Sequence, residues 1–451
     1  LDVSGFDTSQ AVSMNGMFER CGKLRTIDVS NFNTENVQNM SSMFERCSSL
    51  SVIDVSGFRT PNLSQASFMF SSCGVESLDL GNFIFTNMEQ AREMFGGTSK
   101  LKSLTLKNFC SDKLVNCYCM ISSSGIEYLE IDGFRCGKGC NMHSMMSNNF
   151  KLKTLIIRDF DARRATDMGY MFSQCGNLEE MDLSTMYTED VTKLDAMFGW
   201  CYKVKHLDIS GMRTSNVTSM NYMFNCAALE ELDVSRFDTR NATDMGSMFC
   251  GCESLKKLDL SNFNTEKVTM MYSMFEGCCN LSELNLSSFR TPELKNTYAM
   301  FRKCYCLTEL DLSGFTTDKL TDAAYMFYHC NMLKSLDITH FTAASIEKAG
   351  SMFSYCLSLK ELDIRNMVFG EMPSKNDIYR EEDGLKSFLR GSRNLNEIYM
   401  DLSKAGDSFM ISSMFNEMSP NVTLHLKDGI VSERIKALIP ETWTVIPFQA
   451  Q

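Results

Sequence analysis

The chain has 451 residues, a formal net charge of −12 and an isoelectric point near 5.1. A general binder of nucleic acid or of anionic membrane needs clustered lysine and arginine, so this balance predicts that the protein binds no nucleic acid. No apolar run approaches the roughly 20 residues that span a bilayer, and we expect no membrane span in this segment.

The predicted elements recur along the chain about every 26 residues. Residues 21–47 read CGKLRTIDVSNFNTENVQNMSSMFERC, and residues 226–252 read CAALEELDVSRFDTRNATDMGSMFCGC. A period of about 20–50 residues is typical of stacked supersecondary units that bury their apolar sides only against neighbouring units. The sequence therefore predicts a solenoid that grows by repeats and needs no second core.

Each repeat is predicted to hold a strand, a turn and a helical segment. Residues 27–29 alternate inward and outward, which indicates a strand. Ser30 and Thr34 then bracket a turn. Residues 37–47 carry apolar side chains three and four positions apart, which favours a short helix or 3₁₀ turn. We predict an α/β repeat solenoid over residues 1–370, with parallel strands on one face and short helical turns on the other.

The pattern changes towards the end of the chain. Residues 371–384 insert polar side chains and are predicted to form an exposed loop. Residues 385–451 read as degenerate last repeats and a C-terminal cap, with strands expected near Ile398 and at residues 422–424. Residues 430–439 favour a short amphipathic helix that begins after Ser432 and ends at Pro440.

Eleven of the nineteen cysteines fall at one phase of the repeat, where we expect them to point into the core as reduced, small apolar side chains. Residues 107–145 depart from this phase. Six potential soft ligands gather there: Cys110, Cys117, Cys119, Cys136, Cys140 and His143. These side chains are compatible with three hypotheses: a zinc site, a local disulfide or free thiols. Because paired C-x-x-C motifs are missing, we assign no metal and no cofactor.

The repeat template is L-D-[VLI]-S-x-F-x-T-x-x-V-T-x-M-x-x-M-F-x-x-C-x-x-L. It resembles the BspA-like leucine-rich-repeat surface proteins of bacteria, strongly over residues 1–370 and weakly beyond. The resemblance implies a leucine-rich-repeat solenoid that is secreted or displayed on the cell surface, and a role in adhesion. It implies no catalytic residues. Thr98, Ser124 and Asn149 stand near the cysteine phase in three repeats, where the family pattern is weakest.

Two outward columns of charged residues are predicted on the strand face. The aspartate column consists of Asp2, Asp28, Asp54, Asp79, Asp182, Asp208, Asp233, Asp259, Asp311, Asp337 and Asp363. The second column consists of Glu180, His206, Glu231, Lys257, Glu283, Glu309 and Glu361. Carboxylates about 5 Å apart repel by roughly 0.8 kcal/mol even at water's dielectric. Either a basic partner or cation offsets this repulsion, or each aspartate bonds to Ser and Thr of its own turn, which we favour for the aspartate column.

Residues 107–145 form the second candidate surface, because they are basic in an acidic chain. The cations that we assign to partner binding there are Lys107, Lys113, Arg135 and Lys138. On the strand face, the residues assigned to partner binding are Glu180, Asp182, His206, Asp208, Glu231, Asp233, Lys257, Asp259, Glu283, Glu309, Asp311, Glu361 and Asp363.

The sequence favours binding over catalysis. Five histidines are scattered through the repeat, and no nucleophile elbow, phosphate loop or zinc-protease motif is present. We therefore expect a non-enzymatic module, secreted or on the cell surface, that binds a host or bacterial surface protein or a glycan through the solenoid face. The alternative is a structural spacer or envelope element that associates end to end with further copies.

Overall fold

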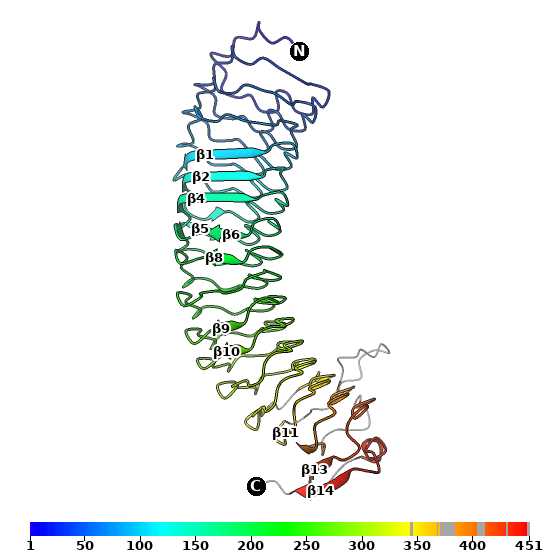
Figure 1. The fold of residues 1–451 in the computed structure, drawn as a ribbon. Coiled ribbons are helices and arrows are strands. Elements are labelled where there is room, and N and C mark those ends of the chain that lie inside the picture. Colours follow the sequence, from blue (N-terminus) through cyan, green and yellow to red (C-terminus); the bar gives the residue numbers. More distant parts are fainter. Residues whose placement is uncertain (343–345, 368, 370–383, 404–410, 430–431, 449–451) are drawn as a thin grey trace. The chain divides into compact units, whose positions relative to one another are not determined.

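The computed structural model describes residues 1–342, 346–367, 369, 384–403, 411–429 and 432–448 (Figure 1). The chain divides into two compact units. The first holds Leu1–Val217 and Ala227–Leu229, and the second holds Thr218–Cys226 and Glu230–Gln451. Each unit is a stack of parallel repeats, and many hydrogen-bonded partners on successive repeats lie 25 or 26 positions apart, as the Thr34 and Thr192 bonds illustrate. The predicted repeat solenoid is therefore confirmed.

The first unit contains three parallel sheets. Its four-stranded sheet orders β1 (Ser103–Cys110), β2 (Tyr128–Arg135), β4 (Thr154–Asp161) and β7 (Met186–Tyr187). Two smaller sheets pair β3 (Cys140–Asn141) with β5 (Ala165–Asp167), and β6 (Glu180–Asp182) with β8 (His206–Asp208). Leu104, Leu129 and Leu155 lie opposite one another on β1, β2 and β4, so identical phases of the repeat stack in register (Figure 1).

Within its described residues, the second unit contains two parallel sheets and one helix. One sheet pairs β9 (Lys257–Asp259) with β10 (Glu283–Asn285), and the other orders β11 (Glu361–Ile364), β12 (Glu397–Met400), β13 (Thr423–Lys427) and β14 (Thr444–Phe448). β12 and β13 confirm the strands predicted near Ile398 and at residues 422–424. Helix α1 (Glu433–Lys436) confirms the predicted C-terminal helix, and the Ser432 hydroxyl accepts the Ile435 N–H at 3.4 Å as its N-cap. The predicted polar loop at 371–384 lies, apart from Gly384, outside the described residues.

The prediction of helical segments opposite the strands was wrong. In the described residues α1 is the only helix, and residues 40–47 form successive β-turns instead. The N–H of Met43 bonds within its own repeat to the Met40 carbonyl at 3.2 Å, whereas the N–H of Met40 bonds to Gln65 of the next repeat at 2.8 Å. Ser42 holds a φ of 55° because a turn requires it there. Alternate N–H groups thus join neighbouring repeats, which an α-helix could not do.

The core of each unit is built from stacked identical side chains. Rings of Phe44 and Phe70 stack at 5.6 Å in the first unit, and those of Phe275 and Phe301 stack at 5.5 Å in the second. Aromatic burial of this kind stabilises the contact between repeats. The repeated Met-Phe pair is therefore a structural feature of the core.

The cysteine phase forms a ladder of thiols inside the core. Cys278 donates its S–H to the Phe249 carbonyl of the preceding repeat at 3.1 Å, and Cys304 donates in the same way to Phe275 at 3.1 Å. All nineteen cysteines are free thiols. Burial raises the pKa of Cys356 to about 12, which keeps this thiol protonated at neutral pH. The prediction of reduced core cysteines is confirmed.

Candidate binding surfaces

The aspartate column is accounted for by the fold itself. In the first unit, the Ser184 N–H donates to Asp182 at 2.9 Å and the Ser210 N–H donates to Asp208 at 2.9 Å. In the second unit, the N–H groups of Ser235, Ser261 and Ser313 bond to Asp233, Asp259 and Asp311 at 2.8 to 3.0 Å. Asp363 instead holds Arg365, with 2.6 Å between the Asp363 Oδ2 and Arg365 Nη2 atoms.

These bonds close an Asx turn in each repeat that carries the aspartate. Hydrogen bonds from the Ser184 side chain and backbone lower the pKa of Asp182, and the corresponding bonds from Ser235 lower that of Asp233. The carboxylates therefore recur because the turn recurs. This result confirms the interpretation that each aspartate is bonded within its own turn.

The second column is different, because its charged groups face solvent. Glu180 and His206 lie opposite each other on β6 and β8 of the first unit, and both are exposed. In the second unit, Lys257 on β9 and Glu283 on β10 form an ion pair at 2.6 Å, with side chains 70% and 63% exposed. An ion pair this exposed contributes little to stability.

The remaining members of the second column are Glu231, Glu309 and Glu361, all exposed in the second unit. Within the part of the chain that the structure describes, the side chains of Glu231 and Glu309 form no hydrogen bond or ion pair, and the same holds for the side chain of Glu180 in the first unit. The fold thus gives these carboxylates no internal role.

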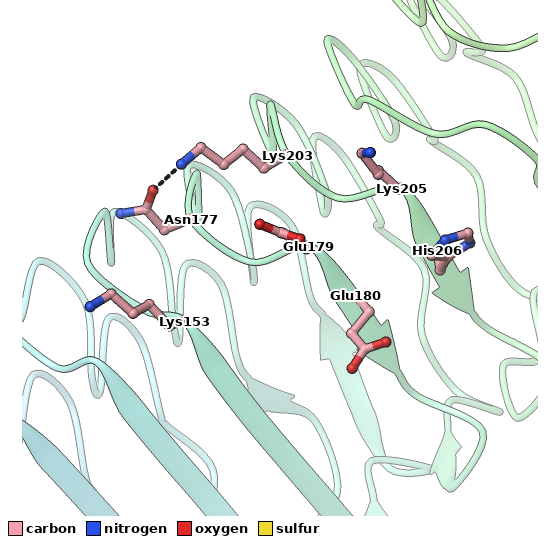
Figure 2. A pocket seen from close by; sticks show the side chains of 7 residues that line it. All are labelled: Lys153, Asn177, Glu179, Glu180, Lys203, Lys205 and His206. Carbon is pink, nitrogen blue, oxygen red and sulfur yellow. Dashed lines mark hydrogen bonds between the residues drawn. The ribbon is translucent and has the colours of Figure 1, made fainter.

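A hollow of about 720 Å³ opens beside Glu180 and His206 in the first unit (Figure 2). It is lined by Lys153, Asn177, Glu179, Glu180, Lys203, Lys205 and His206. Lys203 crosses part of its rim to donate to the Asn177 side chain at 2.8 Å, as Figure 2 shows. Because amines, an amide and carboxylates line the same hollow, it suits a polar ligand with both donors and acceptors.

Sequence analysis placed Glu180 and His206 correctly on the surface but did not find the other lining residues. A signal for them exists. Lys102, Glu127, Lys153, Glu179 and Lys205 follow one another at steps of one repeat, so the sign of the charge alternates along this edge. The Lys153 amine contacts the Glu127 carboxylate at 2.7 Å, which lowers the pKa of Glu127.

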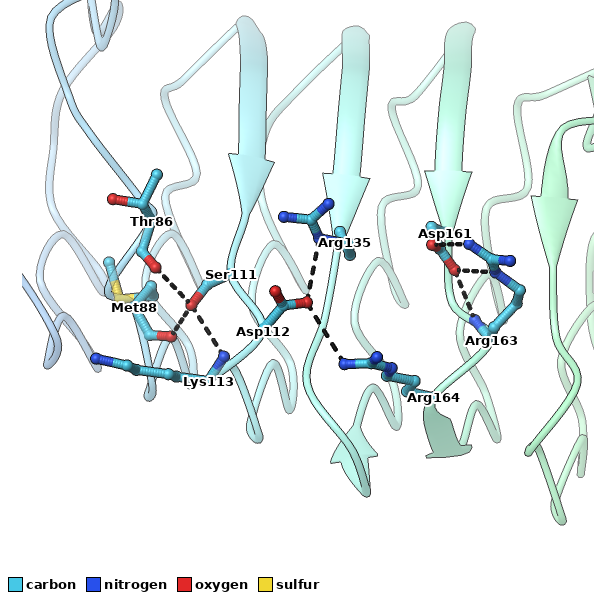
Figure 3. A network of polar contacts seen from close by, with 9 residues as sticks. All are labelled: Thr86, Met88, Ser111, Asp112, Lys113, Arg135, Asp161, Arg163 and Arg164. Carbon is cyan, nitrogen blue, oxygen red and sulfur yellow. Dashed lines mark hydrogen bonds and ion pairs between the residues drawn. The ribbon is translucent and has the colours of Figure 1, made fainter.

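The basic candidate residues lie near the ends of the long strands β1 and β2. Lys107 is exposed on β1 and lies in register with Asp132 of β2. Lys113 donates to the Asn87 side chain at 2.9 Å. Arg135 ends β2 and contacts Asp112 at 3.3 Å (Figure 3). Lys138 is exposed in the segment that follows.

The cysteines of residues 107–145 are free thiols, so the disulfide reading is contradicted. No cluster of three or more His, Cys, Asp or Glu side chains suited to a metal occurs in the described ranges. A hydrogen bond to Cys140 and burial raise the pKa of Cys136, whereas a hydrogen bond to Cys117 and burial raise that of Cys140. His143 contacts Asp167 at 3.3 Å and packs between Tyr118 and Tyr170, with ring centroids 5.8 and 5.2 Å away.

A cluster of aromatic residues in the second unit was missed by the sequence analysis. Tyr298, Tyr325, Tyr328 and Tyr355 are half-buried at turn positions where other repeats carry Ser, Gly or Asn. Arg302 lies over the Tyr325 and Tyr328 rings, 5.6 and 5.5 Å from their centroids. Tyrosine in place of a small residue at these positions is the sequence signal that could have identified this aromatic cluster. Tyrosine and arginine are enriched at the centres of protein interfaces.

A family model described as Mycoplasma protein of unknown function, DUF285, matches residues 1–109, 117–228, 196–309 and 279–387. The chain belongs to this family. The DUF285 matches overlap from one to the next, as expected of a model built on repeats. No curated protein matches the chain significantly.

Solved structures similar to this DUF285 chain include three bacterial repeat proteins. A leucine-rich-repeat protein from Eubacterium ventriosum is 15% identical and covers 79% of this chain and 84% of its own, with a TM-score of 0.30. A leucine-rich-repeat protein of Leptospira interrogans is 15% identical and covers 86% and 95%, with a TM-score of 0.22. The functional domain of InlJ from Listeria monocytogenes, which includes a cysteine ladder, is 14% identical and covers 95% and 82%, with a TM-score of 0.17.

A search of the described residues for a helix of the length and apolarity needed to span a membrane finds none.

Proposed function

We propose that this protein is a non-enzymatic recognition module that binds a protein or glycan partner through the exposed second column of its strand face. One observation carries the proposal. In the same repeats, the aspartates are bonded within their own turns, whereas the carboxylates of Glu180, Glu231 and Glu309 have no bonded partner among the described residues. Each unit thus carries carboxylates that the fold does not use, and these are available to a partner with basic or hydrogen-bond-donating groups.

The hollow beside Glu180 and His206 supports partner binding by the first unit, because amines and an amide line it together with members of the second column. The repeat motif resembles that of BspA-like surface proteins, and on this basis we propose a secreted or cell-surface location. The family description and the repeat fold are both compatible with binding and point to no reaction.

The test is capture of ligands from an array of matrix proteins, mucins and glycans at two salt concentrations. The variant Glu231→Gln/Glu283→Gln/Glu309→Gln/Glu361→Gln neutralises the column in the second unit. A matched control, Glu253→Gln/Glu266→Gln/Glu347→Gln/Glu441→Gln, removes the same charge from exposed positions outside the column. We expect a ligand whose binding is salt-sensitive. The column variant should bind it about tenfold or more weakly, and the control variant should bind it like the unmodified protein. The two differ because, at physiological salt, only charges close to the ligand contribute strongly to its binding.

Capture of no ligand at either salt would contradict the proposal. If the protein then also self-associates as its concentration rises, the structural alternative of an end-to-end spacer would replace it. A ligand that both variants bind equally well would remove the second column from the binding surface.

A further inference from the structure

One outward column of the first unit has a clear structural role in four repeats. It lies four residues after the core phenylalanine of each repeat, and it carries asparagine at positions 36, 62, 87 and 216. Each of these asparagines donates its amide to a backbone carbonyl of the preceding repeat, as Asn62 does to Glu35 at 2.8 Å and Asn216 does to Glu189 at 2.8 Å. Asparagine at this position therefore links neighbouring repeats by a hydrogen bond.

Three consecutive repeats replace this asparagine with a cation, at Lys113, Lys138 and Arg164. The three residues lie on adjacent repeats, because the Gly137 N–H bonds to the Leu114 carbonyl at 2.8 Å and the Gly139 N–H bonds to the Arg164 carbonyl at 2.8 Å. Parallel repeats stack about 4.8 Å apart, so the row places like charges at roughly that spacing. All three side chains are exposed. We call these residues the cationic row.

Little in the chain neutralises the cationic row. Lys113 donates to the neutral Asn87 amide, and Lys138 forms no hydrogen bond or ion pair with the described residues. Arg164 shares one oxygen of Asp112 with Arg135, at 3.5 and 3.3 Å (Figure 3). Each guanidinium carries five N–H donors, so this one exposed carboxylate leaves most of them available.

In the second unit, cations and anions alternate along the same column. In the same column of the second unit, Lys267 is followed by Glu293 and then Lys319, and Lys319 contacts Glu293 at 2.6 Å. Neighbouring Arg163 is also neutralised, because Asp161 accepts two of its N–H groups at 2.9 and 2.6 Å. The cationic row is thus an exception within a chain of net charge −12.

We propose that the cationic row, together with Arg135, binds a linear polysaccharide that carries closely spaced sulfate groups. Sulfate oxygens accept hydrogen bonds from ammonium and guanidinium groups at once, and a linear chain laid along the row meets one cation per repeat. The inference goes beyond the proposed function, because it assigns a ligand class to the basic candidate surface and not to the second column.

The surroundings favour a glycan over a protein or a nucleic acid. A protein interface needs an apolar or aromatic centre, and of the large apolar side chains in residues 107–145 only Val115 is exposed, at 40%. A nucleic-acid site extends along many phosphates, whereas this row ends at Asp190, whose N–H bonds to the Arg163 carbonyl at 2.8 Å on the next repeat. A short row bounded by carboxylates fits a few sulfate groups of a flexible polysaccharide.

The test is binding of the full chain to immobilised heparin at several salt concentrations. The variant Lys138→Gln/Arg164→Gln is expected to bind about tenfold more weakly and to show a shallower salt dependence, because two counterion-releasing contacts are lost. Lys267→Gln/Lys319→Gln removes the same net charge from the same column of the second unit and should bind within about twofold of the unmodified protein. Arg163→Gln should behave like this control, since its guanidinium is already held by Asp161.

Four outcomes would overturn the inference: no heparin binding by the unmodified protein, equal loss in the row and control variants, equal binding of fully desulfated heparin, or tighter binding of polyglutamate or single-stranded DNA. Melting of each variant identifies any that fails to fold, and Lys113→Gln then replaces it as a single change in the row. A ligand that depends on the second column but not on sulfate would leave the proposed function standing while refuting this inference.

Discussion

Phe263→Ala is expected to lower the free energy of unfolding by about 3–5 kcal/mol, because it removes a large side chain from a close-packed core. Phe263 is 1% exposed and belongs to the phenylalanine phase that recurs in nearly every repeat. The same change at Phe32, which is 5% exposed, is expected to act similarly. Guanidinium unfolding followed by circular dichroism measures the loss.

The matched control for Phe263 is Phe150, whose side chain is 58% exposed. Phe150→Ala should change stability by less than about 1 kcal/mol, since surface substitutions remove few contacts. If Phe263→Ala unfolded at the same denaturant concentration as Phe150→Ala, the phenylalanine phase would not be the core of the stack.

Asn149→Ala is expected to cost at least about 3 kcal/mol, since it leaves several buried polar groups without a partner. Asn149 is fully buried near the cysteine phase. Its Oδ1 accepts from the Ser124 N–H at 2.9 Å and from the Ser124 hydroxyl at 2.7 Å, and its amide donates to the carbonyls of Ile121 and Met146 at 3.1 and 2.8 Å. The measurement is again denaturant unfolding.

Asn216→Ala provides the control for this change, because Asn216 is exposed and its amide makes one bond, to the Glu189 carbonyl. Its loss should be below about 1 kcal/mol. Equal losses at Asn149 and Asn216 would show that the buried network does not hold the irregular repeats together.

The strand half of each repeat was predictable, because buried and exposed side chains alternate along a strand and the sequence shows the same alternation of apolar and polar residues. The opposite half was not, because apolar residues three and four apart, such as Met40, Met43 and Phe44, suit both an α-helix and consecutive β-turns. What decides between the two is where the N–H of Met40 finds its acceptor. That acceptor is Gln65 of the next repeat, a contact that no local pattern encodes.

The candidate surfaces were predictable only in part. Outward aspartates were visible in the sequence, and the serine two positions after most of them suggested the Asx turn that the structure shows. The hollow beside Glu180 was not predictable, because Lys153, Asn177 and Lys203 converge there from separate repeats. Which cations of the basic surface are paired likewise depends on contacts between repeats, such as that of Arg135 with Asp112, which the sequence does not contain.

We propose that the aspartate column stabilises the fold and that the second column binds a partner. The most direct test compares the melting temperatures of Asp233→Ala/Asp311→Ala and Glu231→Ala/Glu309→Ala, which change residues on the same repeats. Each lost aspartate bond should cost about 0.5–1.5 kcal/mol, so we expect the aspartate variant to melt measurably lower and the glutamate variant to melt like the unmodified protein. Equal melting of the two variants, or a larger loss in the glutamate variant, would contradict this division between fold and recognition.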